Sequence, residues 1–153
     1  MASYYPPVGF YFKVEFQGID GFTDDDIRFQ EVSGLTAEIE MEEIKDGAAP
    51  GYTYKFPKRA KHANLVLKRG MLKSSALIKY FENAFDSYFN QFNFSFSPCT
   101  IVIQLLNENS EPLSSWQINN AFPVKWQISE FKSNANEIVV ETLEFGFQNF
   151  KRL

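Results

Sequence analysis

The sequence is poor in the residues from which most metal and catalytic sites are built. Its 153 residues include one cysteine, Cys99, and one histidine, His62. A single cysteine excludes an intrachain disulfide, and these two residues are too few for an all-protein zinc site. We therefore expect both residues to be structural, with no metal and no cofactor bound.

Motifs for phosphate binding and for nucleophilic catalysis are also missing. The sequence contains no G-x-G-x-x-G, no Walker A pattern and no G-x-S-x-G elbow. The adjacent aspartates 24–26 lack the spacing of an EF-hand calcium loop. The glutamates between residues 38 and 43 are more typical of a solvated or ion-paired strand face than of an acid/base pair. We predict that the protein is not an enzyme and has no catalytic residue.

Excess positive charge and long apolar runs are absent as well. The net charge is −4, whereas nucleic-acid binding requires clustered Lys and Arg, so we expect no specific nucleic-acid partner. No window approaches the roughly 18 consecutive apolar residues of a membrane helix, and residues 1–7 do not resemble a signal peptide. We expect synthesis in the cytoplasm and no membrane association.

What the sequence does hold is typical of a packed β protein. Phe 17, Tyr 7 and Trp 2 make 17% of the residues aromatic, and only 22% are charged. The length suits one domain, 1–153, which can bury a core without disulfides. Phe10, Phe12, Val14 and Phe16 alternate with polar or amphipathic residues, which predicts a first strand over residues 10–17.

The next stretch predicts a long hairpin. An extended segment should run over residues 27–44, with a bend or bulge at Ser33-Gly34. The turn formers of residues 46–51 then form an exposed tip, and residues 52–56 return. If the hairpin pairs symmetrically about its tip, Glu42 faces Lys55 and Glu38 faces Arg59.

The second half predicts one helix among further strands. A strand over 63–69 precedes residues 75–89, where Leu77, Phe81, Phe85 and Tyr88 follow helical spacing and are expected to be buried, with Ser74 or Ser75 as the N-cap. Strands should follow over 100–106, 116–118 and 122–128, the last with apolar residues at even positions. Near the end, Ile138 and Val140 are apolar at even positions but Leu143, Phe145 and Phe147 at odd ones. We predict a bulge near Glu141-Thr142, where the inward face switches.

Together these segments predict a mainly β fold. It should be an antiparallel β-barrel of two packed sheets, with one α-helix and a long protruding β-hairpin.

Three features occur in the order found in tube proteins of contractile phage tails. They are the hairpin with Gly47, Pro50 and Gly51 at its tip, the L-x-L-K-R-G strand end before the helix, and the V-E-T-L-E-F strand at 140–145. Nearly the whole chain resembles this family, and most of all the inner tube subunits of extracellular contractile injection systems. These are similar in fold to the type VI secretion tube protein.

The resemblance implies a structural subunit that forms hexameric rings stacked into a tube. Its partners would be further copies of itself, a sheath protein, baseplate and spike proteins, and cargo in the lumen. The particle would be made in the bacterial cytoplasm and released by lysis. The residues expected to make contacts between subunits and rings are Glu38, Glu40, Glu42, Glu43, Asp46, Gly47, Ala48, Ala49, Pro50, Gly51, Tyr52, Lys55, Lys58 and Arg59.

Two alternatives remain open on the sequence. The chain could form a first ring that adapts the tube to the baseplate, or it could be a stand-alone β-barrel that binds a small ligand in its interior. Large inward residues such as Phe16, Trp126 and Phe145 argue against a ligand cavity, because they can fill the interior themselves.

Overall fold

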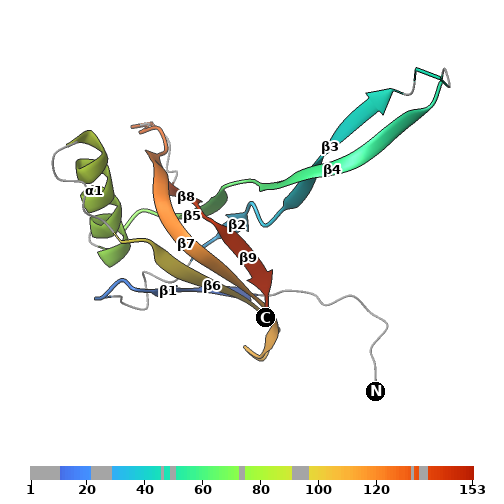
Figure 1. Ribbon diagram of the computed structural model, residues 1–153. Helices are drawn as coiled ribbons and strands as arrows, with labels where there is room; N and C mark the ends of the chain where they lie inside the picture. Colours follow the sequence, from blue (N-terminus) through green and yellow to red (C-terminus); the bar gives the residue numbers. More distant parts are fainter. Residues whose placement is uncertain are drawn as a thin grey trace.

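Figure 1 shows the computed structural model, which describes residues 11–21, 29–45, 47–48, 51–72, 75–90, 97–131, 133–134 and 138–153. In chain order the elements in these ranges are β1 (Tyr11–Gln17), β2 (Glu31–Ser33), β3 (Ala37–Lys45), β4 (Thr53–His62), β5 (Leu65–Gly70), α1 (Ala76–Phe89), β6 (Cys99–Leu106), β7 (Pro112–Ile128), β8 (Val140–Gly146) and β9 (Asn149–Arg152). The mainly β fold with one helix and a protruding hairpin is thus confirmed.

The long strand β7 joins two antiparallel sheets. Its first part pairs with β6 and β9, and β6 continues the sheet to β1. Its second part pairs with β8, which continues through β5 to β2. Asn120, close to the change of partner between Ala121 and Phe122, has a φ of 52°, an uncommon value outside glycine. Among the described strands, the order ends at β1 on one side and at β2 on the other.

The space between the sheets is filled by side chains. The first strand contributes Val14 and Phe16, as its alternation predicted, whereas Phe10 lies outside the described residues. The ring of Phe145 packs against Phe16 and Phe81, with centroids 6.0 and 5.0 Å apart. The other buried members of this core are Leu65, Leu67, Leu77, Cys99, Ile101, Ile103, Ile118, Ala121, Leu143 and Phe147.

Helix α1 begins and ends close to where the sequence predicted. Ser75 is the N-cap, and its hydroxyl accepts a hydrogen bond from the Ile78 amide at 3.3 Å. Leu77 and Phe81 are fully buried, but Phe85 and Tyr88 are only half-buried. The buried face therefore covers a narrower part of the helix than the apolar spacing indicated.

The predicted bulge in the last long strand is wrong. Strand β8 pairs with β5 without interruption, and its inward positions are Glu141, Leu143 and Phe145. The apolar pattern breaks because an inward position holds a carboxylate, whose partner is Arg69 on β5. The Arg69 Nε–Glu141 Oε2 distance is 3.3 Å, and the side chains are only 2% and 1% exposed.

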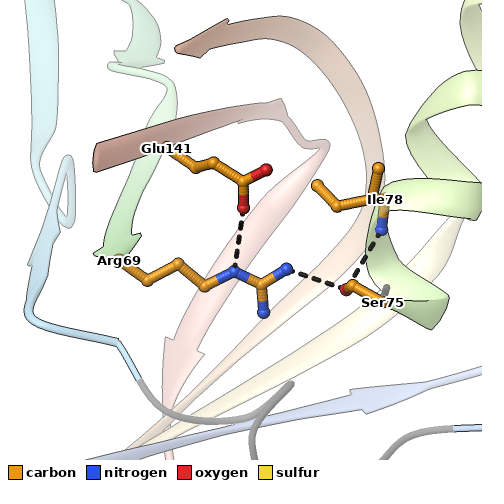
Figure 2. A network of polar contacts seen from close by, with 4 residues as sticks. All are labelled: Arg69, Ser75, Ile78 and Glu141. Carbon is orange, nitrogen blue, oxygen red and sulfur yellow. Dashed lines mark hydrogen bonds and ion pairs between the residues drawn. The ribbon is translucent and has the colours of Figure 1, made fainter. Parts of the chain in front are cut away.

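Arg69 also connects this ion pair to the helix. Its Nη2 donates a hydrogen bond to the Ser75 hydroxyl at 2.8 Å, and its guanidinium lies 5.2 Å from the centre of the Phe29 ring. Figure 2 shows the continuous set of contacts from Glu141 through Arg69 and Ser75 to the first turn of α1. One buried polar network therefore fastens the start of the helix to the β5–β8 pair.

The irregularity expected in β8 lies instead in its neighbour. Strand β7 shifts register against β8 between Pro123 and Lys125. Before the shift Ala121 and Pro123 face inward, while Phe122 is 36% exposed and lies over Gly146 on the outer face. After it Trp126 packs against the core. The even-numbered alternation over 122–128 therefore did not mark one continuous inward face.

Candidate assembly surface

Strands β3 and β4 form a two-stranded ribbon that projects away from the two sheets (Figure 1). We call residues 37–62 the arm. Each strand of the arm pairs with the other, and no further described strand or helix runs beside them. At about 3.3 Å per residue, ten residues of β4 span roughly 33 Å. An isolated two-stranded hairpin is at best marginally stable in water, so the arm gains stability if another surface covers it.

The register of the arm differs from the symmetric one. Near the tip Glu42 lies opposite Phe56 and Glu43 opposite Lys55, one position from the symmetric register, and the register shifts again between Ile39 and Met41. A bulge of this kind sets two residues of one strand against one of the other, so at the base of the arm Glu38 lies opposite Lys61, two positions from Arg59. The predicted Glu42–Lys55 and Glu38–Arg59 pairs are therefore wrong.

The ion pairs that form lie on the exposed surface of the arm. Lys55 Nζ is 3.9 Å from Glu43 Oε1, and Lys61 Nζ is 3.9 Å from Glu38 and 3.7 Å from Glu40. Exposed pairs of this type contribute at most about 1 kcal/mol each. Lys61 was not among the predicted contact residues, although it is a basic residue of β4 like Lys55, Lys58 and Arg59.

The arm also carries apolar side chains that sequence analysis did not single out. Ile39 and Met41 are 61% and 62% exposed, and Ile44, Tyr54 and Phe56 are also exposed. The rings of Tyr54 and Phe56 stack with centroids 6.5 Å apart. These residues lie between charged residues in a segment that sequence analysis predicted to protrude. A protruding strand has no core in which apolar side chains can be buried, so their exposure could have been predicted.

The structure places the predicted contact residues along this arm. Those on its strands are Glu38, Glu40, Glu42, Glu43, Lys55, Lys58 and Arg59, and those at its tip are Gly47, Ala48, Gly51 and Tyr52. Asp46, Ala49 and Pro50 lie outside the described residues. Every predicted residue that the structure describes on the two strands is exposed except Glu40, which is half-buried. Whether these residues touch another subunit stays a prediction.

The single cysteine and the single histidine both pack against other parts of the structure. Cys99 is a buried free thiol, and burial raises its pKa to about 11. His62 lies at the base of the arm, with its ring stacked on Phe147. Within the described ranges, no group of three or more His, Cys, Asp and Glu residues is arranged to hold a metal ion. No described helix is long and apolar enough to span a bilayer.

The described chain thus consists of two antiparallel sheets, one helix and an arm that has no other described element beside it. A family profile described as T4-like virus tail tube protein gp19 matches residues 8–151. The chain therefore belongs to the tail tube protein family of phages and contractile injection systems. The members of this family are structural tube proteins. A search of curated proteins found no match.

Solved structures of contractile particles contain similar chains. A chain in the baseplate of the anti-feeding prophage is 29% identical, with a TM-score of 0.84, and the similarity covers 100% of this chain and 97% of that one. A chain of the sheath/tube terminator of PVC, an extracellular contractile injection system, is 25% identical with a TM-score of 0.79, covering 99% of each chain.

A more distant similarity extends to Hcp proteins. Hcp1 from Flavobacterium johnsoniae is 13% identical with a TM-score of 0.51, and the similarity covers 94% of each chain. At this level of identity the similarity shows a shared fold.

Proposed function

We propose that this tail tube protein is a main subunit of the inner tube, which forms hexameric rings that stack around a lumen for cargo. The observation that carries this proposal is the arm, whose exposed Ile39, Met41 and Tyr54 have no partner surface within the described chain. A ribbon with exposed apolar groups and free strand edges gains stability when a neighbouring copy covers it.

The same surfaces support assembly around a ring and along an axis. Strands β1 and β2 end the strand order of the described sheets, so each has an edge available for a neighbour. The arm protrudes beyond these sheets and is available for the next ring. Contacts between different surfaces of identical subunits close into rings or extend as filaments, depending on the rotation between copies.

The other partners of the proposal come from the particles that contain similar chains. A sheath would surround the tube, and baseplate and spike proteins would lie at its end. The protein would have no catalytic activity. It would be made in the bacterial cytoplasm and become part of a phage tail or an injection particle.

Removal of the arm tip tests the proposal. Deletion of residues 47–51 should leave a folded subunit, because it removes no residue of a described strand or helix, but should prevent ring stacking. Size-exclusion chromatography and electron microscopy of the parent and the deletion variant provide the measurement. Long tubes from the deletion variant would contradict the role of the tip. A parent protein that remains a 17.7 kDa monomer at all concentrations would instead favour a stand-alone binding module.

A first-ring adaptor at the baseplate is the second candidate. The similarity to a baseplate chain of the anti-feeding prophage favours it. A main tube subunit should polymerise alone into tubes of many rings, whereas an adaptor should stop at single rings until a baseplate is added.

A further inference from the structure

The direction of the arm is determined at its base, because neither of its strands runs beside another described element. Both chain segments that lead into the arm pass through a small cluster of contacts. We call this cluster the root junction and define it as Gly34, His62, Asn64, Glu144, Phe147 and Gln148. Its residues come from the segments that enter and leave the arm, from β8 and from the turn after β8.

The first contact is a close crossing of the two segments. Gly34, between β2 and β3, has a φ of 99°, and a Cβ built on it would lie 2.0 Å from the Asn64 carbonyl oxygen. Asn64 lies between β4 and β5, so the crossing joins the entry of the arm to its exit. Backbone atoms cannot move aside as a flexible side chain can, so only glycine allows this approach.

The second contact is made by His62, the last residue of the arm. Its ring stacks on Phe147 at a centroid distance of 4.0 Å and an interplanar angle of 8°. With the ring proton on Nε2, the imidazole donates a hydrogen bond to the Gln148 carbonyl oxygen at 3.2 Å, while Nδ1 lies 3.3 Å from the carbonyl oxygen of the adjacent Ala63. The imidazole therefore fixes β4 against the turn between β8 and β9 by an apolar and a polar contact together.

The remaining contacts extend the junction into the sheets. The Asn64 side-chain amide donates to Glu144 Oε1 on β8 at 2.9 Å. Phe147 is buried and meets Phe150 of β9 edge-on, with ring centroids 5.8 Å apart. Through these residues the base of the arm rests on side chains that are themselves held by the core.

We propose that the root junction holds the arm in one direction in the free subunit, with His62 as the positioning residue. The inference rests on the proposed function, because a fixed direction matters only if the arm meets a second copy. Association is weakened when a binding element must first be ordered, and a preorganised element avoids that cost. If loss of the His62 contacts reduces the correctly directed fraction of arms to about a tenth, apparent affinity falls about tenfold.

The direction of the arm can be measured by pulsed electron spin resonance on the full chain. Spin labels at Thr53→Cys in the arm and Lys13→Cys on β1, in a Cys99→Ala background, report one arm-to-sheet distance. We expect a narrow distribution in this parent and a broad one with His62→Ala. Lys61→Ala is the matched control, because Lys61 makes its ion pairs within the arm. It should retain the narrow distribution.

Two further variants separate the parts of the His62 contact. His62→Phe keeps a ring for Phe147 but loses the donor to Gln148, and His62→Gln keeps a side-chain donor but loses the ring. Each should restore part of the narrow distribution. Near-UV circular dichroism shows whether each variant keeps the packed core. If His62→Ala fails to fold, the comparison of His62→Phe with the parent decides, and a distribution as narrow as the parent's would overturn the proposal.

Assembly is measured separately on unlabelled protein, as the lowest concentration at which the parent and His62→Ala form rings or tubes. We expect that concentration to rise about tenfold in His62→Ala. A variant with a broadened arm but an unchanged assembly concentration would overturn the positioning role while leaving the tube function intact. A parent that never assembles would refute the proposed function itself, whatever the spin labels show.

Discussion

Breaking the buried Arg69–Glu141 pair should be among the most damaging single changes in the protein. Both side chains are almost fully buried, so Glu141→Leu leaves the Arg69 guanidinium without its carboxylate in the core. Loss of one partner from a buried pair costs about 3–5 kcal/mol, which is a large share of the roughly 5–15 kcal/mol that stabilise a domain. Arg69→Met should cost at least as much, because it also removes the hydrogen bond to Ser75.

The double variant distinguishes this reasoning from a simple loss of packing. Arg69→Met with Glu141→Leu removes both charges, so its free energy of unfolding should return to within about 1–2 kcal/mol of the parent or exceed it. Urea unfolding followed by tryptophan fluorescence measures all four proteins. At about 2 kcal/mol per M, a loss of 3–5 kcal/mol lowers the midpoint by roughly 1.5–2.5 M.

The surface pair of Lys68 and Glu31 provides the matched control. It joins the neighbouring positions of β5 and β2 at 3.9 Å, but its side chains are 41% and 58% exposed. Lys68→Ala should therefore cost no more than about 1 kcal/mol. If Glu141→Leu is as mild as Lys68→Ala, or if the double variant is as unstable as the sum of the single ones, the pair does not act through its buried charge.

Three further predictions concern the core, the thiol and the lumen. Phe81→Ala should cost about 3–5 kcal/mol in urea unfolding, whereas Phe89→Ala on the exposed end of α1 should change stability by less than about 0.5 kcal/mol. Cys99 should resist alkylation at neutral pH in the folded protein and react readily in urea. Because the thiol pKa is raised from 9.0 to about 11, its contribution to stability is complete below pH 9 and is lost as pH rises through about 11. Assembled tubes should not retain labelled DNA at low salt, since the net charge of −4 favours a negative or mixed lumen; tight, salt-sensitive retention would contradict this.

The elements that sequence analysis predicted well are those set by local chemistry. Alternation placed Val14 and Phe16 inward, and the N-cap hydroxyl of Ser75 marked the start of α1. The bend predicted at Ser33-Gly34 is present, because β2 ends at Ser33 and Gly34 has positive φ. Each of these features depends on residues within one turn or one strand.

The errors arose where a residue's environment depends on distant partners. In the sequence, the carboxylate of Glu141 indicated that the inward face of the strand changes there. The side chain can face inward because it pairs with Arg69, which is 72 residues away in the sequence. The bulge in β4 and the register shift of β7 lie beside Pro57 and Pro123, and each changes which residues share a face. A proline inside a strand is a signal for a bulge, but it does not determine which residues pair across the strands. For the same reason the arm was predicted correctly as a charged hairpin, but its ion pairs were not.

The separation of charge between the two strands of the arm bears on how copies can associate. All four glutamates of the predicted contact set lie on β3, while β4 carries Lys55, Lys58, Arg59 and Lys61 without an acidic residue. Pairing of two copies through the same edge would set β3 against β3 or β4 against β4, with like charges opposed across the strands. Contact between unlike edges brings opposite charges together, and only such heterologous contacts continue into rings or filaments. Exposed ion pairs add little to the stability of the subunit itself, so this pattern acts mainly on the geometry of association.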